Sequence, residues 1–254
     1  KSLRTRKDGK LIWFHCSSIG ELKSIFPIID NYLKKNQILV TTSTLSSNEI
    51  FEKKYKNTEN IIHQYAPIDS PQIIKKFFKR WKPDVIFFTE SEIWPNQIFY
   101  AKNNGIPIIL LNARISNKSF IKWKLIKNSM SQILNCFDLI LSQNNESADN
   151  FKYFGTNNVM MLGNLKFVIS EDFDSHKENL NLENRLIFIA LSTHPSEEEI
   201  CIKAHASLKL QFSNLLTIII PRHINRIPEI EKKIINTKIG WGYFLKLDPP
   251  NTTL

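Results

Sequence analysis

The stretch "LIWFHCSSIGELKSIFPIIDNYLKK", residues 11–35, decides the fold of this chain. Residues 11–16 form a short apolar run, which is typical of a buried strand. Residues 22–35 repeat apolar side chains at the period of a helix. A short polar segment with one glycine separates the two. The stretch therefore predicts a strand followed directly by a helix, which is the repeating unit of a parallel α/β sheet.

The same alternation of apolar runs and helical segments continues along the chain. The further strand candidates are "QILVTT", "NIIHQYA", "DVIFFTE", "PIILLNA", "FDLILSQ" and "NVMMLG". Their spacing leaves one helix between most neighbours, which predicts a parallel sheet with helices on its faces. We expect residues 1–165 to form one Rossmann-like domain.

A polar segment without strong period, residues 166–185, is predicted to be a linker. After it "RLIFIALS", a helical "SEEEICIKAHASLKLQF" and "NLLTIIIPR" begin a second series. Residues 186–254 hold two clear strands, whereas a doubly wound sheet needs about five or six. We therefore predict a second Rossmann-like domain that is incomplete in this chain.

The amino-acid composition and net charge narrow the classes of binding partner that this chain can have. The net charge is +10, from 34 Lys and Arg against 24 Asp and Glu, which favours an anionic partner such as phosphates or acidic lipid headgroups. No RNP, zinc-finger or helix-turn-helix signature occurs, so no nucleic acid is expected. No apolar window is long enough to span a bilayer. The first residue is Lys and not Met, so an upstream segment is expected to have been removed or to lie outside this sequence.

Three widely spaced cysteines without a disulfide or metal-ligand pattern indicate a reducing compartment. The six histidines have no close metal spacing, and we expect no metal and no cofactor. None of the seven glycines belongs to a GxGxxG or GxxxxGKS pattern, the glycine-rich loops that hold nucleotide phosphates. A bound nucleotide is therefore not expected to be held by such a loop.

Glu21 supports two interpretations. Ser18 with Glu21 three residues later matches the S-x-x-E capping box at the start of a helix. The alternative is a general base that takes a proton from an attacking hydroxyl, with Gly20 leaving room for a substrate beside it. Pro27 lies well inside the segment, so the helix is expected to start later or to kink there.

Two further carboxylates, Glu90 and Glu92, follow the strand "DVIFFTE". In an extended segment they face the same side and can serve acid–base work or hold sugar hydroxyls. The alternative is that one of them caps the following helix, in which Pro95 suits the first turn.

Four cationic or polarisable residues also follow apolar runs. Arg114, Lys166 and Arg222 are each candidates for binding phosphate or carboxylate, although a single such residue is more often a surface charge. His194 lies near a predicted helix start, where backbone N–H groups bind anions, or it is an ordinary neighbour of a cap.

Together these segments resemble the 3-deoxy-D-manno-octulosonic acid (Kdo) transferases of lipopolysaccharide synthesis. The matching blocks run in the family's order from residue 11 to about residue 230: "HCSSIGE", "TTSTLSS", "APIDSPQIIKKFFKRWKPDVIFFTESEIWPN", "GIPIILLNARISNKS", "GNLKF", "STHPSEEE" and "IIIPRHINR". The resemblance implies a GT-B glycosyltransferase with two Rossmann-like domains. It implies metal-independent transfer of Kdo from CMP-Kdo to a lipid A precursor (lipid IVA), with inversion at the anomeric carbon.

The resemblance also implies roles for individual residues. By motif match Glu21 is the general base, and Glu90 and Lys166 support the transition state. Pro221 and Arg222 fall on part of the CMP site. The family works at the cytoplasmic face of the inner membrane.

This chain departs from the family pattern at both ends. The family's hydrophobic anchor precedes the first matching block, and the "MGEL"-like and glycine-rich "GGHN" blocks that complete the CMP site follow beyond Leu254. We therefore expect the polypeptide alone to be inactive. Two alternatives remain open: a related GT-B enzyme that uses another sugar nucleotide, and a non-catalytic remnant that binds acidic lipid.

Overall fold

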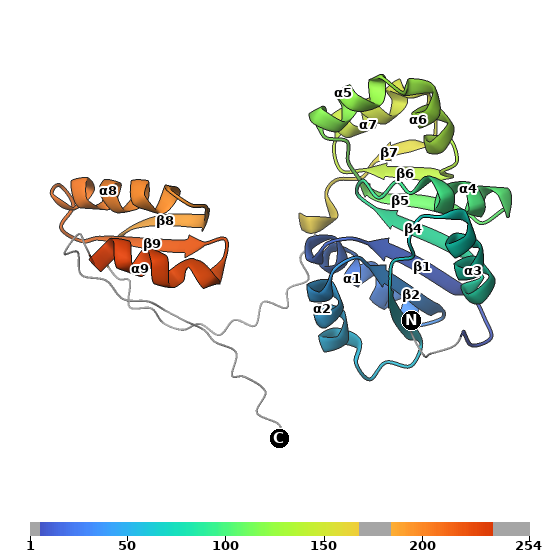
Figure 1. Cartoon of the computed structure of the whole chain (residues 1–254), viewed down its shortest axis with the longest axis horizontal. Helices are drawn as coiled ribbons and strands as arrows, with labels where there is room; N and C mark the ends of the chain where they lie inside the picture. Colours follow the sequence, from blue (N-terminus) through green and yellow to red (C-terminus); the bar gives the residue numbers. More distant parts are fainter. Residues whose placement is uncertain (1–5, 168–183, 236–254) are drawn as a thin grey trace. The chain divides into compact units, whose positions relative to one another are not determined.

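The computed structural model describes residues 6–167 and 184–235, and the chain divides into two compact units (Figure 1). The first unit is Lys1–Asp174 and the second is Ser175–Leu254. The division falls inside residues 166–185, the predicted linker, of which residues 168–183 lie outside the described residues. Each unit is described by itself below.

The first unit alternates strands and helices. Its strands are β1 (Leu11–Cys16), β2 (Gln37–Thr42), β3 (Ile61–Tyr65), β4 (Val85–Thr89), β5 (Ile108–Ala113), β6 (Leu139–Ser142) and β7 (Val159–Met161). Its helices are α1 (Ile19–Leu33), α2 (Leu45–Tyr55), α3 (Pro71–Trp81), α4 (Pro95–Asn103), α5 (Asn117–Lys124), α6 (Lys127–Leu134), α7 (Asn145–Tyr153) and the short 3₁₀ helix η1 (Leu165–Phe167). All seven strands predicted for this part of the chain are confirmed.

The strands form one parallel sheet in the order β3-β2-β1-β4-β5-β6-β7. Successive strands are added from β1 outward to β3 on one side, and from β4 outward to β7 on the other. The direction of winding therefore reverses between β1 and β4. In open α/β sheets, ligands bind beyond the carboxyl ends of the strands at such a reversal.

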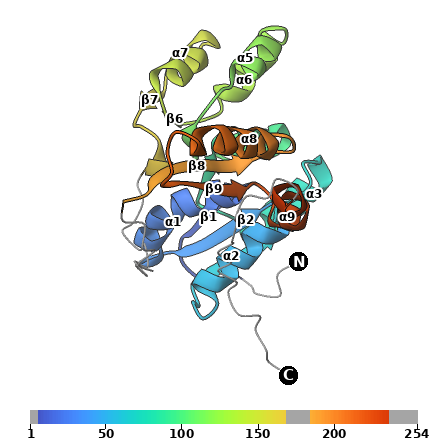
Figure 2. The same ribbon diagram turned by 90° about the vertical axis from the view of Figure 1, so that its left-hand side faces the viewer.

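The side chains of β1 alternate between two apolar cores, because successive residues of a strand point to opposite faces. Leu11 and Trp13 enter a large core with residues of α3, α4, α6 and α7. Ile12 and Phe14 enter a second core with residues of α1 and α2, two helices that contact each other on that face (Figures 1 and 2). Burial on both faces explains why the strands read as continuous apolar runs.

Helix α1 begins at Ile19, directly after its N-cap Ser18, and continues through Pro27 to Leu33. The expectation of a later start is therefore wrong. Proline removes one backbone donor inside the helix. The cap at Ser18 and the burial of Leu22, Ile25 and Ile29 in the second core stabilise the helix in spite of that loss.

The second unit has a parallel pair of strands among its described residues. β8 (Leu186–Thr193) leads through α8 (Glu197–Lys209) to β9 (Leu215–Pro221), and η2 (Ile224–Arg226) and α9 (Ile227–Ile235) follow. This confirms the predicted strand, helix and strand. A register shift between Leu191 and Thr193 places Ser192 at φ 61°.

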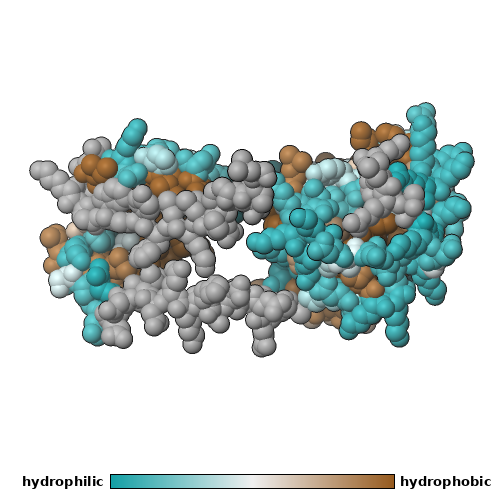
Figure 3. Space-filling model, turned by 90° about the horizontal axis from the view of Figure 1, so that it is seen from below, coloured by the Kyte–Doolittle hydropathy of each residue, from teal (hydrophilic) through white to brown (hydrophobic). Residues whose placement is uncertain are grey.

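The face of the first unit seen in Figure 3 is mostly hydrophilic, with hydrophobic patches among the polar residues. Within residues 6–167 and 184–235, no helix has the length and apolar content needed to cross a bilayer.

The half-buried imidazole of His63 makes the stability of the first unit depend on pH. Its ring contacts Phe51 and its Nε2 lies 2.9 Å from the Thr42 hydroxyl, and burial lowers the pKa of His63 from 6.5 to about 4. Between these two values the unfolded chain binds more protons than the folded chain, so the folding equilibrium constant falls by at most about tenfold per pH unit on acidification.

His63→Gln is expected to flatten this dependence, measured as the urea midpoint across the window from pH 6.5 to about 4. His223→Gln, which removes an exposed histidine, is the matched control. An unchanged slope in His63→Gln would contradict the assignment.

Candidate active site

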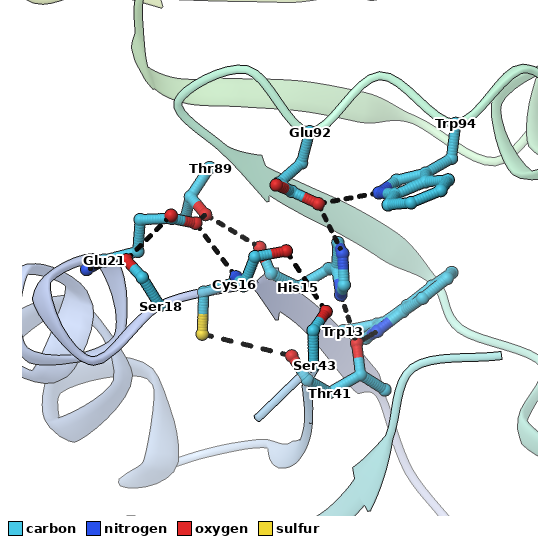
Figure 4. Close-up of polar contacts among 11 residues, drawn as sticks. Trp13, His15, Cys16, Ser18, Glu21, Thr41, Ser43, Thr89, Glu92 and Trp94 are labelled. Carbon is cyan, nitrogen blue, oxygen red and sulfur yellow. Dashed lines mark hydrogen bonds and ion pairs between the residues drawn. The ribbon is translucent and has the colours of Figure 1, made fainter. Parts of the chain in front are cut away.

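Polar side chains of the first unit converge beyond the carboxyl ends of β1, β4 and β5, at the reversal of the winding (Figure 4). They come from the end of β1 and the first turn of α1, from the end of β4 and the β4–α4 loop, from the end of β5 and from η1. The group comprises His15, Ser17, Ser18, Glu21, Thr89, Glu90, Glu92, Asn112, Arg114 and Lys166. Five predicted site residues, Glu21, Glu90, Glu92, Arg114 and Lys166, therefore belong to one region of the fold.

The Glu21 carboxylate is 7% exposed and is held by three donors (Figure 4). The backbone N–H of Ser17 and the hydroxyl of Thr89 donate to Oε2, at 2.9 and 2.7 Å. The hydroxyl of Ser18 donates to Oε1 at 2.8 Å, and the Ser18 hydroxyl oxygen accepts the Glu21 backbone N–H at 3.2 Å.

These contacts give Glu21 a capping role, the first of the two interpretations that the sequence supported. The backbone donor is Ser17, one residue before the N-cap, and the carboxylate is largely closed to solvent. In this conformation an incoming hydroxyl reaches Oε1 only if the Ser18 hydroxyl turns away. The role as a general base stays a prediction.

A buried chain of hydrogen bonds runs from the core to Glu92. The indole N–H of Trp13 lies 2.8 Å from the Thr41 hydroxyl oxygen, which lies 2.8 Å from Nδ1 of His15. Nε2 of His15 lies 3.0 Å from Glu92 Oε2. An indole is only a donor and a carboxylate only an acceptor. When Nε2 donates to Glu92 and the Thr41 hydroxyl donates to Nδ1, every group in the chain is satisfied.

Glu92 receives a second donor from the far side, since the indole N–H of Trp94 lies 2.7 Å from Oε2. Burial raises the pKa of Glu92. Interaction with His15, followed by hydrogen bonds from Ser17 and Trp94, outweighs burial and lowers the net pKa below its usual value. The site therefore contains a fixed negative charge at neutral pH.

Glu90 and Lys166 form an ion pair between the end of β4 and η1. Glu90 has the left-handed φ of 49°, which a glutamate rarely adopts. A side chain added at Gly20 would lie 3.6 Å from Cε of Lys166, so the space beside Gly20 is occupied by the lysine in this conformation.

The left-handed turn at Glu90 ends the extended backbone that the prediction assumed, and the two carboxylates after β4 have separate partners in this structure. Their joint role in acid–base work or sugar binding stays a prediction. The alternative, that Glu90 or Glu92 caps the next helix, is wrong. Asp69 accepts the backbone N–H groups of Asn96 and Gln97 at 3.1 and 3.0 Å and so caps α4. Pro95 occupies the first turn of α4, as predicted.

The end of β5 adds an amide and a guanidinium. Asn112 is buried at φ 51°, and its Oδ1 accepts the backbone N–H of Leu165, which anchors η1. Within the described residues its Nδ2 donor has no hydrogen-bond partner. Arg114 is exposed, and its backbone N–H donates to the Glu90 carbonyl at 3.2 Å.

Cys16 lies at the end of β1 but is not a nucleophile at neutral pH. Burial, followed by the charges of Glu21 and Glu92, raises the pKa of its thiol far above the usual value. Cys16, Cys136 and Cys201 are free thiols.

The second unit holds the remaining predicted residues at the carboxyl ends of β8 and β9. Pro221 ends β9, and the exposed Arg222 donates its backbone N–H to the Thr193 carbonyl at 3.0 Å. His194 is exposed, and its backbone N–H donates to Glu197 at 2.7 Å. Ser196 is the N-cap of α8 but makes no side-chain capping bond.

A buried ion pair, which the sequence analysis did not identify, supports this end of the second unit. Arg226 binds Glu198 with two nitrogens at 2.7 and 3.1 Å, and the Thr193 hydroxyl donates to the same carboxylate. Burial raises the pKa of Glu198, but the bonds from Arg226 and Thr193 outweigh it and lower the net pKa.

Sequence reasoning also missed His15, Thr41, Thr89 and Asn112. Each lies within or directly beside a segment that matched the family, but no spacing rule marks it. A polar residue inside an otherwise apolar strand was the available signal for all four, because buried polar groups need partners.

The sheet order, the polar site at its reversal and the start of a second α/β unit define a GT-B-like protein with Rossmann-like domains. The UDP-GlcNAc 2-epimerase of Neisseria meningitidis, solved bound to UDP-GlcNAc, matches with a TM-score of 0.62 at 14% identity, over 90% of this chain and 68% of that chain. A putative UDP-N-acetylglucosamine 2-epimerase of Listeria monocytogenes matches with a TM-score of 0.60 at 11% identity, over 90% and 66%. At such identity the likeness shows the fold alone.

The chain belongs to the 3-deoxy-D-manno-octulosonic-acid transferase family, whose family model matches residues 1–169. The transferase of Rickettsia prowazekii is 36% identical over 92% of this chain and 51% of its own length. That of Aquifex aeolicus is 31% identical over 93% and 62%. A probable mitochondrial transferase of Arabidopsis thaliana is 33% identical over 90% and 54%. The chain therefore spans about half the length of the first of these relatives.

Proposed function

We propose that the protein containing this chain transfers Kdo from CMP-Kdo to a hydroxyl of a lipid A precursor, lipid IVA. The reaction inverts the anomeric carbon, needs no metal or cofactor, and releases CMP. Membership of the Kdo transferase family supports the proposal. The activity is assigned to the whole protein, since this chain covers about half of the relatives' length.

The geometry of Glu21 is the observation that carries the proposal. Oε2 is held by a fixed backbone donor, the Ser17 N–H, as well as by the Thr89 hydroxyl, whereas Oε1 is held by the Ser18 hydroxyl, which can rotate. We assign Oε1 as the base. When the Ser18 hydroxyl turns away, Oε1 accepts the proton of the acceptor hydroxyl, whose oxygen bonds to the anomeric carbon. The bond from that carbon to the phosphate oxygen breaks, and CMP leaves with the electron pair.

Charged side chains around Glu21 are suited to support this step. Lys166 is the cation nearest Gly20 and is oriented by its ion pair with Glu90. An ammonium group there stabilises negative charge that develops on the reacting oxygens. Glu92, fixed by His15 and Trp94, is suited to accept hydrogen bonds from sugar hydroxyls, and Arg114 is suited to an anionic group of a substrate.

We assign the binding of the donor substrate, CMP-Kdo, to the second unit. Arg222 is suited to bidentate binding of the CMP phosphate, with Pro221 and His194 beside it at the ends of β9 and β8. The acceptor is a lipid, so we place the protein at the cytoplasmic face of the inner membrane.

A transfer assay tests the proposal. The full-length protein is incubated with radiolabelled CMP-Kdo and lipid IVA in the presence of EDTA. Labelled lipid that forms with EDTA present and is suppressed by CMP supports the assignment. Suppression by UDP in place of CMP indicates a different sugar nucleotide. Lipid binding without turnover, unaffected by Glu21→Ala, indicates a non-catalytic protein, and either result overturns the proposal.

A further inference from the structure

Helices α5 and α6 meet at a corner that exposes large apolar side chains. Ile121, Leu125 and Ile126 are 65%, 85% and 53% exposed. The four lysines beside them in the sequence, Lys118, Lys122, Lys124 and Lys127, are exposed as well, and Lys124 lies over the rings of Phe120 and Tyr153. We call this surface the α5–α6 patch, and it consists of Lys118, Ile121, Lys122, Leu125, Ile126 and Lys127.

The inward side of the same segment explains why the patch faces outward. Phe120 and Trp123 pack against Phe154, with ring centroids 5.7 and 6.1 Å apart, and so attach α5 to the large core. Lys118, Ile121, Lys122 and Leu125 are spaced three or four residues apart and follow one stripe of the helical segment. The stripe is apolar and basic at once, whereas an ordinary solvated stripe is polar.

All the charged side chains of the segment that contains the α5–α6 patch are positive. Residues 115–137 contain four lysines and no aspartate or glutamate. Lys127 also lies over the ring of the half-exposed Tyr153 of α7, 4.3 Å from its centroid. Helices α5, α6 and α7 gather at the end of the sheet that carries β6 and β7 (Figures 1 and 2).

We propose that the α5–α6 patch docks the protein on an anionic lipid bilayer. Isoleucine and leucine side chains insert at the boundary of headgroups and acyl chains, while the lysine ammonium groups bind lipid phosphates. A second copy of this chain is disfavoured as the occupant, because two such surfaces bring lysines against lysines. Lys118 lies four residues beyond Arg114, so the bilayer contacts the segment that leaves β5 at the candidate site.

The inference goes beyond the proposed reaction, and its test contains no Kdo donor or acceptor. The whole chain is sedimented with vesicles of phosphatidylglycerol and phosphatidylcholine, and separately with vesicles of phosphatidylcholine alone. We expect binding to the first and little to the second. Lys118→Gln with Lys122→Gln lowers binding by about fivefold per lysine. Ile121→Ser with Leu125→Ser lowers it by about tenfold per residue.

Two further variants, a charge-matched control and one expected to bind vesicles more tightly, distinguish the role of the patch from a general effect. Lys75→Gln with Lys79→Gln removes the same charge from the exposed side of α3 and is expected to retain most of the binding. Leu125→Trp is expected to strengthen binding, a result that misfolding does not mimic. The proposal is overturned if the chain does not bind anionic vesicles or if the patch variants bind them like the wild type. It is also overturned if the α3 control loses as much binding as the patch variants do.

Discussion

Replacing Glu21 by Gln is expected to lower the rate of Kdo transfer by about a hundredfold to ten-thousandfold, the usual contribution of a general base. Glutamine has the shape of glutamate and keeps the capping contacts. Its carbonyl accepts from Ser17 and Thr89, and its amide donates to the Ser18 hydroxyl. The thermal midpoint is therefore expected to stay close to that of the wild type. Turnover and thermal unfolding of the same preparation measure both quantities.

Ser18→Ala separates the base from the cap. It removes the donor to Oε1 and the acceptor of the Glu21 N–H, and a lost N-cap costs about 0.5–2 kcal/mol of stability. The base remains in place, so the variant is expected to lose stability and to keep most of its activity. If Glu21→Gln retains wild-type turnover, the carboxylate is a cap alone and the proposed mechanism is wrong.

Trp13→Ala is expected to destabilise the first unit by about 3–5 kcal/mol, the usual loss for a large aromatic deleted from a core. The indole is fully buried and lies 4.7 Å from Phe77 and 5.7 Å from Phe88, centroid to centroid. The change also removes the donor to Thr41 and so disturbs the hydrogen bonds that hold His15. Urea unfolding followed by circular dichroism measures the loss.

Trp13→Phe is the matched control, because it keeps an aromatic ring but removes the N–H. Its expected cost is about 1–3 kcal/mol, that of an unmatched buried polar group. Equal losses in the two variants would show that the hydrogen bond to Thr41, and not packing, dominates the contribution of Trp13.

The strands were predictable because burial on both faces makes each one a continuous apolar run, as in "LIWFHC" and "QILVTT". The start of α1 was predicted less well. Pro27 argued for a later start, whereas the cap at Ser18 and the buried face of the helix place it at Ile19. Two local signals, the proline and the capping box, disagreed there, and the cap together with the buried face of the helix decided.

The location of the site followed from the ends of the strands, but its contacts did not. His15 and Glu92 are 77 positions apart in the sequence, and Glu21 and Thr89 are 68 apart. No single-sequence spacing connects such residues. The two carboxylates after β4 were grouped by their spacing, yet the left-handed backbone at Glu90 directs them to separate partners.

The cap that Asp69 places on α4 has a consequence for substrate binding. The loop that carries Glu92 and Trp94 is tied to β4 at one end and to Asp69 at the other, through Asn96. A loop fixed at both ends has little conformational entropy left to lose when a ligand orders it. The entropic cost of ordering this loop is therefore met during folding, and the contacts that a ligand makes there contribute more fully to affinity.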